Sequence, residues 1–315
     1  MIRTRINDLL NVRYPVLQGG MAWVSTASLV SAVSEAGGLG IIGAGGMTPE
    51  ELRENIRQVK TNTSYPFGVN LMLLSPDINE HIEVVKKENV PVVTTGAGNP
   101  GSLIKEFEAL HILTIPVVSS VMLAKRLERL GARAVIAEGL ESGGHIGEVT
   151  TMCLMPQMVD ALDIPVIAAG GIADGRGIVA SLALGAEGVQ LGTRFVCSEE
   201  CNVHVHYKES ILKATDRSTV TTGVSTGHPV RCLRNRLTRK FQELEGQGVC
   251  REEIEKMGAG CLKLAVCDGD VQEGSVMAGQ ISGLIHDIKP VQAIISSMMD
   301  DVVRVIDKLG RLVEV

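Results

Sequence analysis

Short apolar runs recur at nearly regular spacing along the first two thirds of the chain. Eight of them are rich in β-branched residues and are bounded by turn residues, which is typical of buried strands. Three of the runs contain proline near their start, and we expect each proline at the first residue of its strand, a position that strands tolerate. The predicted strands cover residues 15–18, 39–42, 67–71, 90–93, 115–118, 133–136, 164–167 and 188–191.

Helical patterns fill the intervals between these runs. The sequence Thr-Pro-Glu-Glu at 48–51 predicts a helix start, with Thr48 as N-cap and Glu51 reaching back to it. Apolar residues then recur at helical spacing. Similar patterns end at turn signals such as Gly131 and predict helices over residues 78–89, 102–111 and 121–130.

This alternation indicates the fold class. One strand and one helix recur about every 25 residues, and continuous apolar strands suit a parallel sheet that is covered on both faces. Eight such units predict an α/β protein with a (β/α)₈ TIM barrel. The alternative is a doubly wound open sheet.

The rhythm breaks after Phe195, which suggests three regions. We expect the barrel to occupy residues 1–196. Residues 197–273 give no regular strand pattern and carry dense charge, so we expect a smaller, mostly helical lid over the mouth of the barrel. In residues 274–315, apolar helical character returns at 274–280, and a final amphipathic helix over 291–309 is expected to pack back on the barrel.

Composition narrows the class of protein. The chain has 315 residues and no apolar run long enough to span a bilayer, and its first residues lack a signal-peptide core, so we expect a cytoplasmic protein without a membrane partner. A net charge of −6 and 3% aromatic residues argue against nucleic-acid binding.

Cysteine usage favours reduced, packed thiols. There are seven cysteines and no C-x-x-C pair, so a disulfide framework is not expected. Cys197 and Cys201 lie four residues apart near His204, which leaves a metal site as the less favoured alternative. We therefore expect no metal site.

Glycine and polar residues cluster where the predicted strands end, which is where barrels bind ligands. The turns after the seventh and eighth strands contain Gly170, Gly171, Gly192 and Thr193, and Gln190 ends the eighth strand. Barrels often hold a phosphate between these two turns, on backbone N–H groups beside a helix N-terminus. We favour a phosphate site, and tight turns alone are the alternative.

The loop at 137–147 follows the sixth predicted strand and holds four glycines, two carboxylates and His145. A histidine on a glycine-rich rim can gain or lose a proton near neutral pH. We expect Glu138 to accept hydrogen bonds from a ligand or a loop and Glu141 to be exposed. The remaining histidines are expected to be structural or superficial, namely His81, His111, His204, His206, His228 and His286.

With these residues in view, the chain closely resembles the flavin-dependent type II enoyl-acyl carrier protein reductases, within the superfamily of the nitronate monooxygenases. The resemblance spans nearly the whole chain and rests on eight motifs in order. They are Q-G-G-M-A-W at 18–23, A-G-G-L-G-I-I-G at 36–43, F-G-V-N at 67–70, V-V-T-T-G-A-G-N-P at 92–100, A-E-G-L-E-S-G-G-H-I-G at 137–147, I-P-V-I-A-A-G-G-I-A-D-G at 164–175, V-Q-L-G-T-R-F at 189–195 and G-S-V-M-A-G-Q at 274–280.

The resemblance implies an FMN-binding barrel with NADH or NADPH as reductant and an enoyl group on acyl carrier protein as substrate. It implies Gly171, Gly192 and Thr193 at the FMN phosphate and His145 at the active site. Homodimers and activation by a monovalent cation are further traits of the family. The residues that it places near the flavin ring and ribityl chain are Gly20, Met21, Ala22, Asn70 and Glu138.

The residues fit this chemistry. Hydride attack on an enoyl thioester leaves an enolate, for which His145 is the candidate hydrogen-bond donor or general acid. Met21 and Met277 could line an apolar slot, and packing in a core is the equal alternative. One alternative function is nitronate oxidation with oxygen, and another is flavin binding without turnover.

A basic stretch at 231–240 leaves two interpretations open. It contains Arg231, Arg234, Arg236, Arg239 and Lys240 without an acid. It could steer an acidic carrier protein or a cofactor phosphate toward the lid. It could equally be a solvated helix face that pairs with the acids at 243 and 245 and with those after Arg251.

Overall fold

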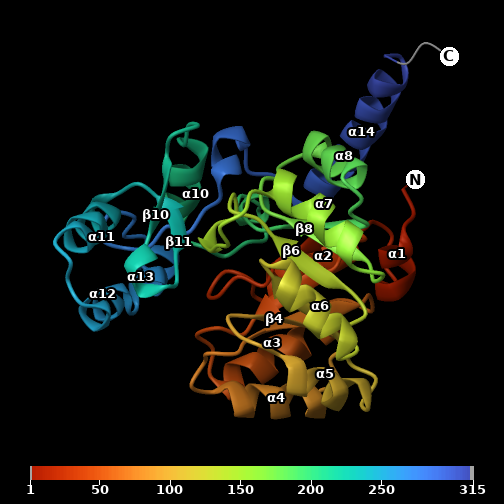
Figure 1. The fold of residues 1–315 in the computed structure, drawn as a ribbon, viewed down its shortest axis with the longest axis horizontal. Helices are drawn as coiled ribbons and strands as arrows, with labels where there is room; N and C mark the ends of the chain where they lie inside the picture. Colours follow the sequence, from red (N-terminus) through yellow and green to blue (C-terminus); the bar gives the residue numbers. More distant parts are fainter. Residues whose placement is uncertain (1, 313–315) are drawn as a thin grey trace.

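Eight parallel strands form a closed barrel in the computed structural model, which describes residues 2–312 (Figure 1). The order around the barrel is β1-β9-β8-β6-β5-β4-β3-β2. Two hydrogen bonds of 2.9 Å, from Gln18 N to Leu39 O and from Leu39 N to Val16 O, join β1 to the start of β2. The strands are β1 (Val16–Gln18), β2 (Gly40–Gly43), β3 (Phe67–Met72), β4 (Val92–Gly96), β5 (Leu113–Val118), β6 (Val135–Glu138), β8 (Val166–Ala169) and β9 (Gly188–Leu191).

This closure confirms the predicted (β/α)₈ barrel and excludes the doubly wound open sheet. All eight predicted strands are present, within a few residues of the expected bounds. Because the strands are parallel, their carboxyl ends meet on one side of the barrel, where ligands bind in this architecture.

Pro116 is an exception to the prediction that proline opens its strand. Strands β4 and β8 begin one residue after Pro91 and Pro165, but Pro116 lies inside β5. Residues 113–116 pair with β4, whereas pairing with β6 begins only at Val117. The missing N–H of Pro116 is therefore tolerated because the strand is paired on one side at that point.

The helices between the strands surround the barrel (Figure 1). The predicted N-cap at Thr48 is confirmed, because Glu51 N donates to its hydroxyl at 3.2 Å and Thr48 N donates to the Glu51 carboxylate at 2.7 Å. The predicted stop at Gly131 is confirmed by its φ of 105°. The helices are α2 (Ala27–Glu35), α3 (Pro49–Asn62), α4 (Ile78–Lys87), α5 (Gly101–Glu108), α6 (Val121–Arg129), α7 (Thr151–Ala161), α8 (Gly175–Ala183) and α9 (Thr193–Val196).

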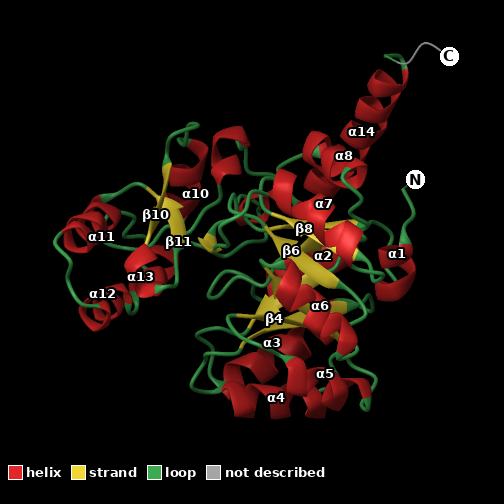
Figure 2. Ribbon diagram, in the orientation of Figure 1, coloured by secondary structure: helices red, strands yellow, loops and turns green. Residues whose placement is uncertain are grey.

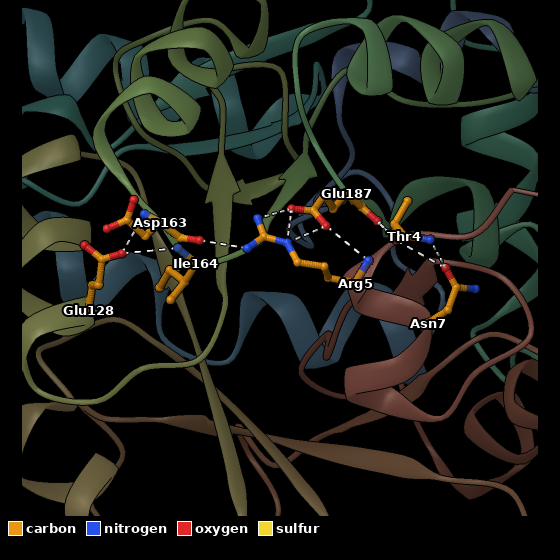
Figure 3. Close-up of polar contacts among 7 residues, drawn as sticks. All are labelled: Thr4, Arg5, Asn7, Glu128, Asp163, Ile164 and Glu187. Carbon is orange, nitrogen blue, oxygen red and sulfur yellow. Dashed lines mark hydrogen bonds and ion pairs between the residues drawn. The ribbon is translucent and has the colours of Figure 1, made fainter.

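Helix α1 (Arg5–Leu10) closes the end of the barrel away from the ligand side. Its Ile6 and Leu10 pack with the inward strand residues of one apolar cluster. Around it, Arg5 donates to the Glu187 carboxylate and to Asp163 O, the latter at 2.8 Å (Figure 3). The Glu128 carboxylate accepts from Asp163 N at 2.8 Å. These contacts join the start of the chain to the segments that lead into β8 and β9.

The lid, residues 197–273, contains more than helices (Figure 2). A three-stranded antiparallel sheet, in the order β10-β11-β7, joins β10 (Thr219–Thr222) and β11 (Val230–Leu233) to β7 (Gly144–His145). The prediction of no regular strands here was wrong, because four-residue strands of mixed polarity give no continuous apolar run. The helices are α10 (Val205–Leu212), α11 (Arg236–Gly246), α12 (Arg251–Gly258) and α13 (Cys261–Cys267), and η1 (Val224–Thr226) is a 3₁₀ turn.

Residues 274–279 are not helical as predicted but run beside β11. Leu233 N donates to Val276 O at 2.8 Å, and Cys232 forms an isolated bridge with Met277. A Cβ at Gly279 would lie 2.7 Å from Glu141 O, so this segment is pressed against the loop of 137–147. The 3₁₀ helix η2 (Gln280–Leu284) follows.

The final helix, α14 (Val291–Gly310), packs its first half on the helices around the barrel. Val291, Ile294, Ile295, Met298 and Val302 are buried, and the helix contacts α8 and α2. Its last turns extend away from the barrel in Figure 1. In residues 2–312, no helix combines the length and the apolar character needed to cross a membrane.

Candidate active site

A cavity of about 710 Å³ opens at the carboxyl ends of the barrel strands, between the barrel and the lid. The lid contributes Tyr207, residues 227–229 and Leu262, and the 274–280 segment contributes Met277 and Gly279. Every site residue predicted from the sequence lines this cavity: Gly20, Met21, Ala22, Asn70, Glu138, His145, Gly170, Gly171, Gln190, Gly192 and Thr193.

The turns after β8 and β9 present unpaired backbone donors to the cavity. In the described part of the chain, the N–H groups of Gly171, Gly192 and Thr193 take part in no protein hydrogen bond. The Thr193 hydroxyl accepts from Gly279 N at 3.0 Å and so keeps its own proton to donate. Such converging donors without a neighbouring lysine suit an anion such as a phosphate.

On the β1 side, a glycine allows a close approach to an amide. A Cβ at Gly20 would lie only 2.3 Å from the Cβ of Asn70, so no other residue fits there. Asn70 Nδ2 donates to Thr94 Oγ1 at 2.9 Å, which fixes the orientation of the amide and leaves Oδ1 as an acceptor. This wall therefore offers the Asn70 Oδ1 acceptor in a fixed orientation, beside the side-chain-free backbone of Gly20.

Glu138 ends β6 and is half-buried at the floor of the cavity. Burial raises the pKa of its carboxyl to about 7, although a hydrogen bond with the Ser142 hydroxyl acts in the opposite direction. A carboxyl in this range is partly protonated at neutral pH. It can therefore either donate or accept a hydrogen bond toward a ligand.

His145 lies in β7, opposite Val230 of β11, with its side chain exposed to the cavity. Enclosure by the cavity walls lowers the pKa of the imidazole, and repulsion from His228 lowers it further. The ring is therefore mostly neutral at pH 7. In that state it has one N–H donor, and no protein partner among residues 2–312 occupies it.

The His145 loop is fixed to the lid by Arg231. This side chain is 6% exposed, and its guanidinium donates to Leu140 O and to Thr219 Oγ1, each at 3.2 Å. Ile146 N also donates to Pro229 O at 3.2 Å. The lid sheet therefore holds the loop that carries His145 in place.

The basic stretch of 231–240 is largely engaged within the chain. Arg236 and Lys240 form ion pairs at 3.0 and 2.7 Å with Glu273, which is one of the acids after Arg251. Arg234 donates to Arg217 O. Together with buried Arg231, these contacts favour a structural interpretation over a free basic face.

Glu141 corrects an expectation, because it is half-buried rather than exposed. Its carboxylate accepts from Thr151 N at 2.9 Å and from Thr151 Oγ1 at 3.0 Å. It therefore caps the first turn of α7 from ten residues upstream. No local helix signal reveals a cap at that separation.

Trp23, Tyr207 and His228 line the cavity but were not identified from the sequence as site residues. Trp23 has a φ of 65°, and the Lys263 ammonium of α13 lies 4.9 Å from its ring. The Tyr207 hydroxyl donates to Met277 O at 2.7 Å. His228 reaches the cavity from the lid. Its Gly-His-Pro context, similar to the Gly-His of 144–145, was the only signal available.

The cysteines show no metal-binding arrangement in residues 2–312. No group of three or more His, Cys, Asp or Glu side chains is placed to hold an ion there. Cys197, Cys201 and Cys232 are buried, and burial raises the pKa of each thiol. These thiols are packed apolar groups rather than ligands.

Comparison with known proteins identifies the family. The nitronate monooxygenase family model matches residues 3–87 and 77–301. A probable nitronate monooxygenase from Staphylococcus saprophyticus is 36% identical over 90% of this chain and 94% of its own. A (3aS,4S,5R,7aS)-5-hydroxy-7a-methyl-1-oxo-octahydro-1H-indene-4-carboxyl-CoA dehydrogenase from Rhodococcus jostii is 33% identical over 99% of both chains.

Solved structures agree with this assignment. FabK from Thermotoga maritima superposes with a TM-score of 0.97 at 52% identity, covering 99% of this chain and 100% of its own. Nitroalkane oxidase from Streptomyces ansochromogenes superposes with a TM-score of 0.86 at 28% identity, covering 96% and 99%. The chain belongs to the nitronate monooxygenase family, and within it this protein is a FabK-like oxidoreductase.

Proposed function

We propose that the protein reduces the 2,3 double bond of a trans-2-enoyl thioester carried on acyl carrier protein, with FMN as cofactor and NADH or NADPH as reductant. Likeness to Thermotoga FabK over the whole chain is the observation that carries this proposal. The carboxyl-CoA in the name of the Rhodococcus relative is also a thioester.

The cavity fits FMN. The unpaired N–H groups of Gly171, Gly192 and Thr193 would hold the phosphate, with Gly170 shaping the same turn. Asn70, Glu138 and Gln190 would offer polar contacts to the ribityl chain and ring, and residues 20–22 would cover the ring. FMN, when bound, accepts a hydride from a nicotinamide and passes it to an electron-poor alkene carbon.

The protein's own residues would stabilise the charge that develops on the substrate. Hydride addition at the β-carbon moves electrons onto the thioester oxygen, and the neutral His145 imidazole can donate a hydrogen bond to that oxygen. Enclosure by the lid excludes water and strengthens this bond. The partly protonated Glu138 is a second proton source on the same face.

The remaining expectations from the resemblance stand as proposals. We propose that the protein acts in fatty-acid synthesis in the cytoplasm and that acyl carrier protein is its partner. A homodimer and activation by a monovalent cation are proposed on the same basis. Separation by size with light scattering, and activity assays in sodium, potassium or choline salts, would test these last two.

Steady-state assays distinguish this function from nitronate oxidation, the activity after which the matching family is named. We expect crotonyl thioester to drive NADH or NADPH oxidation by the purified yellow enzyme. Oxygen uptake that depends on an alkyl nitronate and needs no nicotinamide would support the alternative. A flavin that neither nicotinamide reduces would indicate binding without turnover.

Trp23 gives an independent test of the cofactor site, because it is the only tryptophan in the chain and it lines the cavity. A flavin bound there should quench its fluorescence strongly, and removal of the flavin should restore it. Unchanged emission on flavin binding would place the cofactor elsewhere. A Trp23→Phe variant is the control, because it has no tryptophan whose fluorescence could be quenched.

A further inference from the structure

The charge of the cavity wall does not match the ligands proposed for it. The nicotinamide dinucleotide and the carrier-linked thioester both contain phosphate groups, yet Glu138 and Glu141 line the cavity. No lysine or arginine is among the described lining residues. Only His145 and His228 can therefore bring positive charge directly to the wall.

His228 is held on a rigid turn at the edge of the lid. The Thr226 hydroxyl donates to Gly223 O at 2.7 Å and accepts from His228 N at 3.2 Å. Gly223 and Gly227 have φ values of 74° and 77°, which suit glycine. Since Ile146 N donates to Pro229 O, this turn is fixed directly beside the His145 loop.

The imidazole of His228 is not used by the fold. It is exposed at the cavity, and its ring makes no hydrogen bond with any of residues 2–312. By contrast, His81 Nε2 lies 2.9 Å from Met47 O, and His206 Nδ1 lies 3.2 Å from Gly269 O. The turn thus fixes the backbone of His228 and leaves both ring nitrogens without a protein partner among residues 2–312.

The position of His228 separates it from the site proposed for the FMN phosphate. That site lies on the turns after β8 and β9, whereas His228 precedes β11 in the lid sheet. Its charge nevertheless reaches His145, whose pKa it lowers. His228 therefore borders the space next to the reacting groups, on the lid side.

We propose that His228 is a specificity residue that binds a phosphate group of the incoming ligand at the lid side of the cavity. The ligand chemistry is a phosphate ester or pyrophosphate, supplied either by the nicotinamide dinucleotide or by a pantetheine chain. This inference rests on the proposed function. A histidine on a rigid turn suits this role because charge-assisted hydrogen bonds to phosphate are strong.

The test compares three variants of the holoenzyme. His228→Ala removes the donor, His228→Arg restores a cation, and His286→Ala is the control because His286 is exposed and does not line the cavity. We expect His228→Ala to raise one KM about tenfold with kcat changed less than about twofold, and His228→Arg to restore most of the loss.

The substrates identify the source of the phosphate. If the dinucleotide is bound, KM rises for NADH and NADPH. If the pantetheine chain is bound, KM rises for crotonyl-CoA but not for the crotonyl thioester of N-acetylcysteamine, which has no phosphate. Unchanged values for all ligands, or an equal rise for the N-acetylcysteamine thioester, would overturn the inference.

A binding measurement keeps this test separate from the proposed function. Inorganic pyrophosphate is titrated into the flavin-loaded protein by calorimetry, without turnover. We expect binding to wild type and to His286→Ala, about tenfold weaker binding to His228→Ala, and recovery in His228→Arg. Equal affinities in all four proteins would overturn the role of His228 even if the wild-type enzyme reduces enoyl thioesters.

Discussion

Burial moves the pKa values of His145 and Glu138 in opposite directions, one below 6.5 and the other up to about 7. The imidazole is then mostly neutral at physiological pH, whereas the carboxyl is protonated in part of the molecules. This arrangement favours His145 as a hydrogen-bond donor over a cationic acid. It makes the state of both groups accessible to experiment.

The first prediction concerns His145→Ala. We expect the variant to keep FMN but to lose about 100-fold in kcat, because one donor to the developing oxyanion is removed. In wild type, titration of His145 itself should not change kcat between about pH 7 and 9, since the lowered pKa keeps the ring neutral, and any fall in kcat across this range would report deprotonation of Glu138. Unaltered turnover in the variant would remove His145 from the mechanism.

The second prediction concerns the stability cost of Glu138. Its folded pKa of about 7 exceeds the ordinary carboxyl pKa of 4.5, so between these values the folded state holds a proton that the unfolded chain has released. Wild-type stability should therefore fall as the pH rises from 4.5 through 7. Glu138→Gln should reduce that fall by about 3 kcal/mol, measured by urea unfolding at acid and alkaline pH. Parallel curves would contradict the raised pKa.

The third prediction uses two substitutions at Gly171. Its φ of 76° strains either one similarly, by about 1 kcal/mol. Only Gly171→Asp adds a charge where we place the FMN phosphate, so it should lose flavin whereas Gly171→Ala retains it. The ratio of visible to protein absorbance gives the result, and a fully yellow aspartate variant would refute the placement.

At the scale of elements, the sequence predicts the strands that are continuous apolar runs and the helix starts that have local caps. Strand β8 is a run of buried apolar residues, and the Thr48 cap involves residues three positions apart. Strands β7, β10 and β11 have only two to four residues, and β7 joins this sheet by pairing with β11 about 85 residues away, from His145 to Val230. Glu141 caps α7 from outside the helix, so no local pattern predicts it.

The fourth prediction tests the link between lid sheet and site. Arg231→Met keeps the length of the side chain but removes its bonds to Leu140 O and Thr219 Oγ1. We expect kcat to fall about tenfold, with flavin retained, because the His145 loop loses its anchor. The control is Arg239→Met, at an exposed position in α11. Equal kcat values for both variants would separate the lid from His145.

Across the whole molecule, the cavity and the polar contacts of α1 with Glu187 and Asp163 lie at opposite ends of the barrel. The location of the site was predictable because parallel strands bring their carboxyl-end loops together. The part that the lid contributes, Tyr207 and His228, was not predictable, since nothing local fixes how a lid folds onto a barrel. The placement of His228 depends on the long-range pairing of β11 with β7, and that of Tyr207 on its hydrogen bond to Met277 O.

The fifth prediction follows from this division. Arg5→Ala removes the contacts with Glu187 and Asp163 O at the closed end of the barrel. We expect the free energy of unfolding to fall by about 1 kcal/mol, as for a partly exposed ion pair, with kcat and KM unchanged. A change in turnover without a change in stability would contradict the separation of the two ends.

The central claim is that the cavity passes a hydride from a nicotinamide to an enoyl thioester through a flavin. An anaerobic stopped-flow experiment at about 450 nm tests it most directly, because flavin absorbance reports both the reduction of the flavin by the nicotinamide and its reoxidation by the thioester. We expect NADH or NADPH to bleach the enzyme and crotonyl thioester to restore the colour without oxygen. An enzyme that stays bleached with the thioester and recovers only when oxygen is admitted would contradict the account.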